Sequence, residues 1–193
     1  LSGLVGSEMC IRDRSSSEPI PTSVAGAYSV SVGSSSVCAI GSDKIGICWG
    51  DNSKGQLGNS TAGTLPRKID LLATLSDISV GSAYACAVTE SASLYCWGDL
   101  GTNGQEKYNK PTPTLITEVS NVSSVSVGRN AVCAISGALY CWGAVTNSAI
   151  PTKVSSTDGA TNVAVGDDFF CAVVSATVKC QGDNTQGQLG QGS

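Results

Sequence analysis

The sequence contains no histidine, few charged residues and few aromatic residues. Charged residues make up 13% of its 193 residues and aromatic residues 5%, and the formal net charge is −4. The absence of histidine removes the commonest general base and the commonest metal ligand of proteins. The acidic excess and the lack of basic clusters argue against nucleic-acid binding, because Lys and Arg must neutralise the phosphates. We therefore expect no metal, no cofactor and no nucleic-acid partner.

Motifs of catalysis and long apolar runs are also missing. The sequence has no Ser-His-Asp set, no P-loop, no Cys-x-x-Cys pair and no paired-carboxylate motif in a helical or strand context. Asp167 and Asp168 are adjacent, and adjacent side chains in a turn point apart more often than they converge. No apolar run approaches the roughly 20 residues of a transmembrane helix. We expect a protein that is not an enzyme and has no membrane span.

What the sequence does contain is an internal repeat. Each of its four copies has a Val-Gly dipeptide, and Cys-Ala begins five positions after the glycine. A second cysteine follows 8 to 10 positions later and precedes Trp-Gly in three copies and Gln-Gly in the fourth. The glycines are 48, 47 and 38 positions apart: Gly33, Gly81, Gly128 and Gly166. A period of this length is typical of solenoids and propellers.

Each copy has the pattern of short β-strands. Segments such as Ile78-Ser79-Val80 alternate in polarity, and no segment shows a helical stripe. Another strand is expected in residues 66–69, 113–116 and 151–154, which begin with proline, because proline suits a strand start. Four strands in nearly 50 residues are typical of a propeller blade. We predict an all-β fold of about four blades, each a four-stranded antiparallel sheet.

These motifs resemble the regulator of chromosome condensation repeat family, whose blades carry Val-Gly, Cys-Ala-Leu, Trp-Gly and an Asn-x-x-Gly-Gln-Leu-Gly loop. The resemblance covers nearly all of residues 23–193. Residues 52–58 and 184–190 repeat the loop, the second copy keeps Gly104-Gln105, and the third copy has lost it. The family often has histidine two positions before the first cysteine, where this chain has Ser36, Tyr84, Ala131 and Phe169. The resemblance implies a seven-bladed parent, which the remaining blades of the same chain would complete.

The boundaries of the repeats follow from the same motifs. Residues 4–14, LVGSEMCIRDR, resemble a translated sequencing adapter, so we interpret residues 1–14 as adapter-derived and disordered. A genuine polar tail is the alternative. Propeller repeats then occupy residues 15–193, with copies at about 23–69, 70–116, 117–154 and 155–193. The chain opens on Leu1 and stops within a loop motif, so we expect it to be a fragment, truncated at both ends.

Each copy carries one pair of cysteines once Cys10 is set aside with the adapter-like segment. If the pair lies across an antiparallel hairpin, the turn can change in length without separating the two residues. Directly opposed Cα atoms are roughly 4.5 to 5.5 Å apart, which overlaps the range of a disulfide. We favour disulfides, with eight buried reduced thiols as the alternative. The expected pairs are Cys38 with Cys48, Cys86 with Cys96, Cys133 with Cys141 and Cys171 with Cys180.

The same register also fixes the neighbours of the tryptophans. The expected opposed pairs are Val37 with Trp49, Ala85 with Trp97, Val132 with Trp142 and Phe170 with Gln181. Where the fourth copy has glutamine instead of tryptophan, the aromatic residue is on the opposed strand. This exchange indicates that the tryptophans have a structural role.

The end of the blades where the Val-Gly turns emerge is the candidate binding face. If the strands of a copy alternate in direction, the long loops 51–65, 99–110 and 144–150 emerge at that same end. Varied loops on a rigid scaffold are typical of recognition surfaces, and solvated loops without function are the alternative. The candidate residues are Ser35, Tyr84, Arg129, Asn130, Asp167 and Asp168.

We predict a non-enzymatic scaffold that binds a protein partner of unknown identity. Disulfide-compatible cysteines and low charge suit an oxidising compartment, so we expect a secreted or surface-exposed protein of microbial, metagenomic origin. The resemblance implies that such propellers include protein-binding regulators and enzyme inhibitors. One alternative is an intracellular regulator of the guanine-nucleotide-exchange type with reduced cysteines. The other is a propeller enzyme whose catalytic site lies in missing blades.

Overall fold

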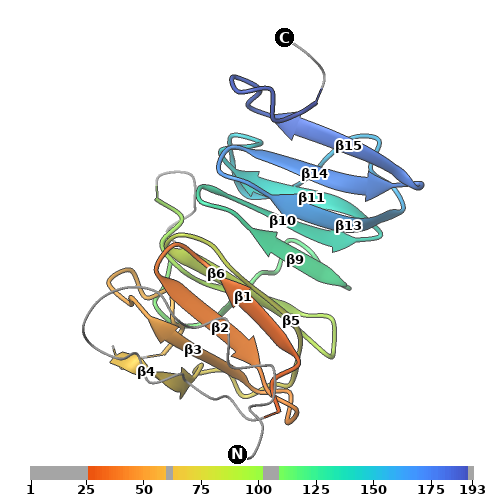
Figure 1. Ribbon diagram of the computed structural model, residues 1–193. Helices are drawn as coiled ribbons and strands as arrows, with labels where there is room; N and C mark the ends of the chain where they lie inside the picture. Colours follow the sequence, from red (N-terminus) through yellow and green to blue (C-terminus); the bar gives the residue numbers. More distant parts are fainter. Residues whose placement is uncertain (1–25, 60–62, 102–108, 191–193) are drawn as a thin grey trace, which may run out of the picture.

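The computed structural model describes residues 26–59, 63–101 and 109–190, which form four antiparallel sheets in chain order (Figure 1). The first sheet contains β1 (Ser29–Val32), β2 (Ser36–Ile40), β3 (Gly46–Gly50) and β4 (Gly63–Lys68). The second contains β5 (Leu75–Val80), β6 (Tyr84–Thr89), β7 (Leu94–Gly98) and β8 (Thr114–Leu115). The third contains β9 (Ser124–Val127), β10 (Ala131–Ser136), β11 (Ala138–Gly143) and β12 (Ser148–Lys153). The fourth contains β13 (Ala160–Val165), β14 (Phe169–Val174) and β15 (Thr177–Gly182).

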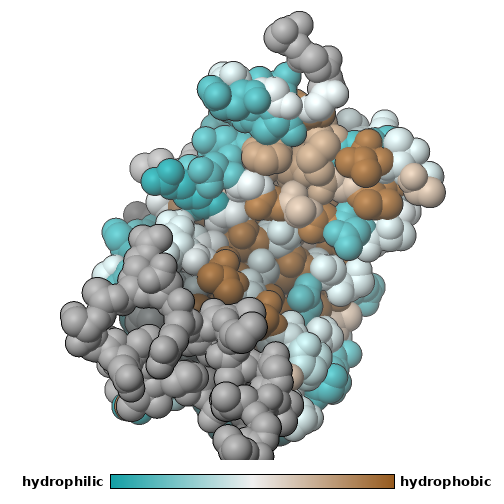
Figure 2. Space-filling model, viewed as in Figure 1, coloured by the Kyte–Doolittle hydropathy of each residue, from teal (hydrophilic) through white to brown (hydrophobic). Residues whose placement is uncertain are grey.

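The sheets are the blades of an arc, and we number them blades 1 to 4. Within each blade, neighbouring strands are consecutive in sequence, as in an up-and-down meander. The first strands of successive blades lie beside one another, β1 by β5, β5 by β9 and β9 by β13. Apolar residues gather over these inner strands on the side of the molecule that Figure 2 shows. The prediction of an all-β fold with about four blades is confirmed, although blade 4 has three strands in the described residues.

The strand register is the one that the cysteine spacing predicted. Each cysteine of a copy lies directly opposite its partner in the central hairpin. The four pairs are disulfides, with sulfur–sulfur distances of 2.05, 2.15, 2.10 and 2.07 Å along the chain. The tryptophan pairs are also confirmed, and Phe170 lies opposite Gln181.

The prolines do not all begin strands, which corrects one expectation. Pro113 directly precedes β8, but Pro66 lies inside β4 and Pro151 inside β12. Both strands are the outer edge of their sheet, and both shift register beside the proline. A proline has no N–H to donate, so a bulge at a sheet edge accommodates it.

The hydrophobic core lies between successive blades and is built around the disulfides. We call the face of a blade that packs on the preceding blade its leading face, and the opposite face its trailing face. The disulfide is on the trailing face, where Cys38 and Cys48 pack with Ile78 and Trp97 of blade 2. The cysteines of blades 1 to 3 are fully buried in this way, at 0% exposure.

The Val-Gly dipeptides bring the inner strands into backbone contact. A β carbon on Gly33 would lie 2.0 Å from the carbonyl oxygen of Gly81. A β carbon on Gly81 would likewise lie 2.0 Å from the carbonyl oxygen of Gly128, and one on Gly128 would lie 1.9 Å from the carbonyl oxygen of Gly166. No side chain fits in these gaps, so glycine is required by contact and not by its backbone angles.

A serine hydroxyl joins each inner strand to the next beside these glycines. The Val80 amide donates to Ser31 Oγ at 3.0 Å, and the Val127 amide donates to Ser79 Oγ at 2.9 Å. The Val165 amide donates to Ser126 Oγ at 3.0 Å. Backbone groups that have no ladder partner between blades are thereby satisfied.

Replacing Gly128 with alanine is expected to lower the free energy of unfolding by about 3 kcal/mol, because the methyl group overpacks the joint between blades 3 and 4. Gly166→Ala is the matched control. The three atoms nearest to its methyl group would all belong to the ring of Phe169, a side chain that can move, so the expected loss is below about 1 kcal/mol. Urea unfolding followed by tryptophan fluorescence measures both. Equal losses in the two variants would contradict the requirement for backbone contact.

Candidate binding face

The Val-Gly turns and the loops after Trp-Gly lie at the same end of every blade. In each blade, the residue that follows the glycine of Trp-Gly or Gln-Gly donates a backbone hydrogen bond to the last residue of the Val-Gly turn. These bonds join Asp51 to Ser35 (2.9 Å), Asp99 to Ala83 (2.8 Å), Ala144 to Asn130 (2.9 Å) and Asp183 to Asp168 (3.0 Å). We call this end, made of turns 33–35, 81–83, 128–130 and 166–168 with the loops beside them, the loop face.

The glycine of Trp-Gly makes this contact possible. Gly98 has a φ of 97°, and a β carbon there would lie 2.3 Å from the carbonyl oxygen of Ala83. Gly50, Gly143 and Gly182 also have a positive φ, between 93° and 126°. A side chain would be strained in this conformation and would also collide with the turn, so the loop is held against the turn in all four blades.

The loop of blade 1 is ordered by its own side chains. Asp51 accepts hydrogen bonds from the Ser53 amide (3.0 Å), the Ser53 hydroxyl (2.9 Å) and Gln56 Nε2 (2.7 Å). The bond from the Ser53 amide is the main reason that the pKa of Asp51 is lowered. Asn52 Oδ1 accepts from the Leu57 amide at 2.9 Å. These are the local bonds by which Asp and Asn stabilise turns.

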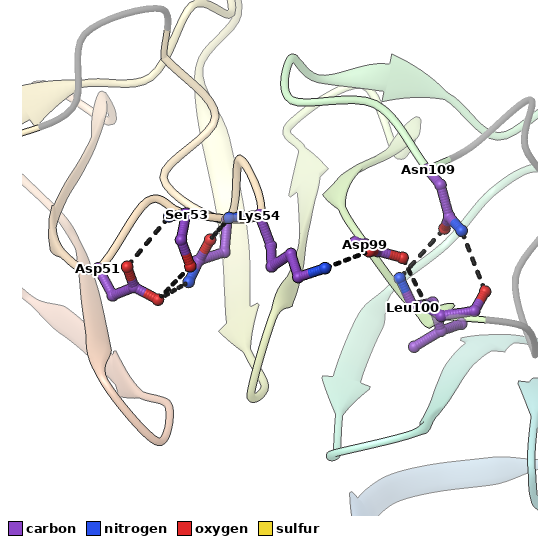
Figure 3. Close-up of polar contacts among 8 residues, drawn as sticks. Asp51, Ser53, Lys54, Asp99, Leu100 and Asn109 are labelled. Atoms are coloured by element: carbon purple, nitrogen blue, oxygen red, sulfur yellow. Dashed lines mark hydrogen bonds and ion pairs between the residues drawn. The ribbon is translucent and has the colours of Figure 1, made fainter.

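An ion pair joins this loop to blade 2 (Figure 3). Lys54 Nζ lies 3.2 Å from Asp99 Oδ2. The hydrogen bond from the Gly101 amide, followed by Lys54, lowers the pKa of Asp99. Asn109 also holds the loop of blade 2. Its Oδ1 accepts from the Leu100 amide (3.1 Å), and its Nδ2 donates to the Gly101 carbonyl (3.1 Å).

Four of the six candidate residues form two contacts between blades 3 and 4. Arg129 Nη1 lies 3.9 Å from Asp167 Oδ2, and Asn130 Nδ2 donates to Asp168 Oδ1 at 3.3 Å. The two adjacent carboxylates thus contact different residues. The Arg129 and Asp167 side chains stay 63% and 70% exposed, and exposed ion pairs of this kind contribute little stability. Their charges therefore remain accessible to a partner.

The other two candidate residues differ from each other. Ser35 is exposed in the turn of blade 1. Tyr84 is 1% exposed, and its proposed place on the binding face is wrong. The turn ends at Ala83, so Tyr84 is already the first residue of β6, and its ring packs with Val132 and Trp142 of blade 3.

The long loops also have different limits from those expected. Strand β4 begins at Gly63 and β12 at Ser148, so the loops of blades 1 and 3 are shorter than 51–65 and 144–150. The loop of blade 2 extends to the start of β8 at Thr114. The Gly104-Gln105 remnant of the loop motif lies outside the described residues.

Sequence reasoning missed the contact between the loop of one blade and the tryptophan of the next. Trp97 Nε1 donates to the carbonyl oxygen of Gln56 at 2.9 Å, and a β carbon on Gly58 would lie 2.7 Å from Trp97 Nε1. The sequence did contain a signal of this contact. The third copy lacks the loop motif, and the fourth copy, which follows it, lacks the tryptophan. Gln181, which replaces it, is exposed.

The described part of the loop face contains hollows. A hollow of about 210 Å³ is lined by residues of three blades, among them Lys54, Asp99, Arg129 and Asn130. A groove of about 740 Å³ lies beside it between blades 1 and 2, and a hollow of about 280 Å³ lies at the Val-Gly turns. In the described part of the chain, no three His, Cys, Asp or Glu side chains are grouped to hold a metal ion. No helix that could cross a bilayer is found in that part either.

Comparisons with known proteins agree with this architecture. The RCC1 repeat models match residues 47–88 and 75–105. Human WBSCR16 is similar over 86% of this chain with a TM-score of 0.78 and 18% identity, and yeast RCC1 (Prp20), solved bound to Kap60, over 85% with a TM-score of 0.75 and 19% identity. The ectodomain of the receptor kinase CR4 from Physcomitrella patens is similar over 86% with a TM-score of 0.61 and 20% identity.

These likenesses establish the fold and its extent. The chain covers 50%, 45% and 45% of the lengths of those three solved chains, so it corresponds to about half of each. A sequence comparison with curated proteins gives no match. Residues 47–105 therefore contain repeats of the regulator of chromosome condensation (RCC1) type, and the four blades have the fold of the similar solved propellers.

Proposed function

We propose that this chain is a non-catalytic scaffold that binds a protein partner at its loop face. The observation that carries this proposal is the row of charges that successive blades present at one end. Lys54, Asp99, Arg129 and Asp167 come from blades 1 to 4 in order, and each stands on a loop or turn fixed by backbone hydrogen bonds. A rigid array of both charge signs favours electrostatic complementarity to another protein.

The described residues also offer little to a catalytic mechanism. All eight cysteines among them are in disulfides, so none presents a thiolate nucleophile. The lowered pKa of Asp51 and of Asp99 keeps these carboxylates charged, whereas a general acid needs a raised pKa. Both carboxylates instead organise loops. These features support a binding role.

An oxidising compartment is the location that we propose for the protein. Four disulfides recur at one position of the repeat, and such bonds persist in secreted proteins and at cell surfaces. One similar solved structure is a receptor ectodomain. The alternative is an intracellular regulator, which the likeness to yeast RCC1 favours.

Reversing charges on the loop face is expected to weaken partner binding. The variant carries Arg129→Glu, Asp167→Lys and Asp168→Lys, and we expect at least about a tenfold loss of affinity, because rim charges must match those of the partner. The wild-type chain is used as bait for proteins of its source medium, and mass spectrometry quantifies what each variant retains.

The control reverses an ion pair at the opposite end of the blades. Lys44 Nζ lies 3.8 Å from Glu90 Oε1, so Lys44→Glu with Glu90→Lys keeps the net charge and leaves the loop face intact. Capture that is retained by this control and lost by the triple variant supports the proposal. Equal capture by all three proteins would count against the loop face.

Thiol counting is expected to separate the two locations. Of the nine cysteines, only Cys10 lies outside the repeats. In protein isolated from its native compartment and denatured without reductant, we expect none of the other eight to react with a thiol reagent. All eight should react after reduction. Eight reactive thiols before reduction would favour the intracellular alternative.

A further inference from the structure

Two asparagines of the chain begin acceptor sequences for N-linked glycosylation. Residues 59–61 read Asn-Ser-Thr, and residues 121–123 read Asn-Val-Ser. Such a sequence carries a glycan only at the surface of a folded protein, because the glycan is bulky and polar. Ser60 and Thr61 lie outside the described residues, whereas both asparagines lie within them. The structure can therefore decide whether each asparagine has room for a glycan.

Asn59 is buried at the end of the loop of blade 1, where it is 3% exposed. Its Nδ2, the atom to which a glycan would be attached, donates to the Leu57 carbonyl at 3.5 Å, and its Oδ1 is buried as well. Its own carbonyl accepts from Asn52 Nδ2 at 3.3 Å. Gly58, the preceding residue, lies so close to Trp97 that a β carbon would collide with the ring. A glycan on Asn59 has no room while this loop packs on Trp97.

Asn121 has the opposite environment, at an exposed bend between β8 and β9. Its φ is 54°, a left-handed conformation that asparagine tolerates. Val122 anchors the bend, since it is 1% exposed and its amide donates to the Ala92 carbonyl at 2.9 Å. Ala92 lies in the turn between β6 and β7, at the end of the blades opposite the loop face. A glycan on Asn121 would therefore extend into solvent and leave the loop face free.

We propose that an N-linked glycan on Asn59 blocks folding, that Asn121 accepts one, and that the chain therefore reaches an oxidising compartment by a route without N-glycosylation. The route rests on the proposed location. Disulfides form in the eukaryotic secretory pathway and also in the bacterial periplasm, so the four disulfides do not distinguish these routes. The buried acceptor asparagine does, and it favours export of the periplasmic kind.

Burial does not protect Asn59 from modification, because the glycan is transferred to the unfolded chain. The donor is an oligosaccharide on a lipid pyrophosphate. The bond between the sugar C1 and the phosphate breaks, a bond between C1 and the asparagine Nδ2 forms, the lipid pyrophosphate leaves, and Nδ2 loses one proton. A chain modified in this way cannot bury Asn59 afterwards. Its loop then cannot cover Trp97, which in the folded protein donates its indole N–H to Gln56.

Secretion of the full chain from yeast, which supplies the donor and the transferase, tests this inference. Enzymatic deglycosylation converts each modified asparagine to aspartate, and peptide mass mapping then locates it. We expect secreted chains to be modified at Asn121 and not at Asn59, and retained chains to be modified at Asn59. Thr61→Ala removes this acceptor sequence without changing Asn59, so it should raise the secreted yield by about twofold or more.

Two controls separate the glycan from the substitution itself. Ser123→Ala removes the other acceptor sequence and one long hydrogen bond, from Ser123 Oγ to the Ile135 carbonyl at 3.3 Å, and it should not raise the yield. In a bacterial periplasm without N-glycosylation, the wild type and Thr61→Ala should give equal yields. Secreted, disulfide-bonded chains with a glycan on Asn59 overturn the proposal. Equal secretion of the wild type and Thr61→Ala from yeast overturns it as well.

Protein from its native source tests the route. We expect the eight cysteines of the repeats to be paired and both asparagines to be unmodified. Paired cysteines with a glycan on either asparagine would overturn the route and leave the proposed location intact, whereas eight free thiols would overturn both. Binding at the loop face does not enter these measurements, so its failure in the capture assay would leave every one of these outcomes unchanged.

Discussion

The rest of the structure depends on the contact between backbones at the four Val-Gly dipeptides. Because the inner strands approach until a β carbon would lie about 2 Å from the next carbonyl, the blades are fixed in angle and height at the axis. The serine bridges set the register of one inner strand against the next. Farther from the inner strands, the gap between neighbouring blades widens. It is filled by the disulfide of one blade and an aromatic residue of the next.

This division explains which residues are free to vary. The outer strands, bulged at Pro66 and Pro151, tolerate irregularity because they are sheet edges far from the axis. The turn after each Val-Gly is held by the glycine of Trp-Gly, so its backbone is fixed while its side chains are not. Such a surface can change its charges without changing its shape, as a recognition scaffold requires.

The sequence was sufficient for the parts of the fold that repeat. Strand number, hairpin register and cysteine pairing follow from residues at constant positions, and a turn of variable length between paired cysteines implies opposition across a hairpin. The burial of Tyr84 could not be predicted, because no repeated residue marks where the turn ends and the strand begins. A shift of that boundary by one residue decides whether a side chain faces solvent or the core. The ion pairs that Lys54 and Arg129 form could not be predicted, since each joins residues about 40 positions apart on different blades.

The loop motif has two parts. One part packs against the next blade, and the other consists of positions whose residues differ between the two copies. Its Gln-Leu-Gly part faces the next blade, where Gln56 accepts the indole N–H and Gly58 makes room for the ring. Its two variable positions, Ser53 and Lys54 in blade 1 and Thr185 and Gln186 in blade 4, are exposed. The first of these binds the loop's own aspartate in both copies, whereas the side chain of Lys54 bonds outside its own loop, to Asp99. Position 54, whose lysine pairs with Asp99, is therefore the position at which this loop can change its specificity for a partner without disturbing the packing of the loop on Trp97.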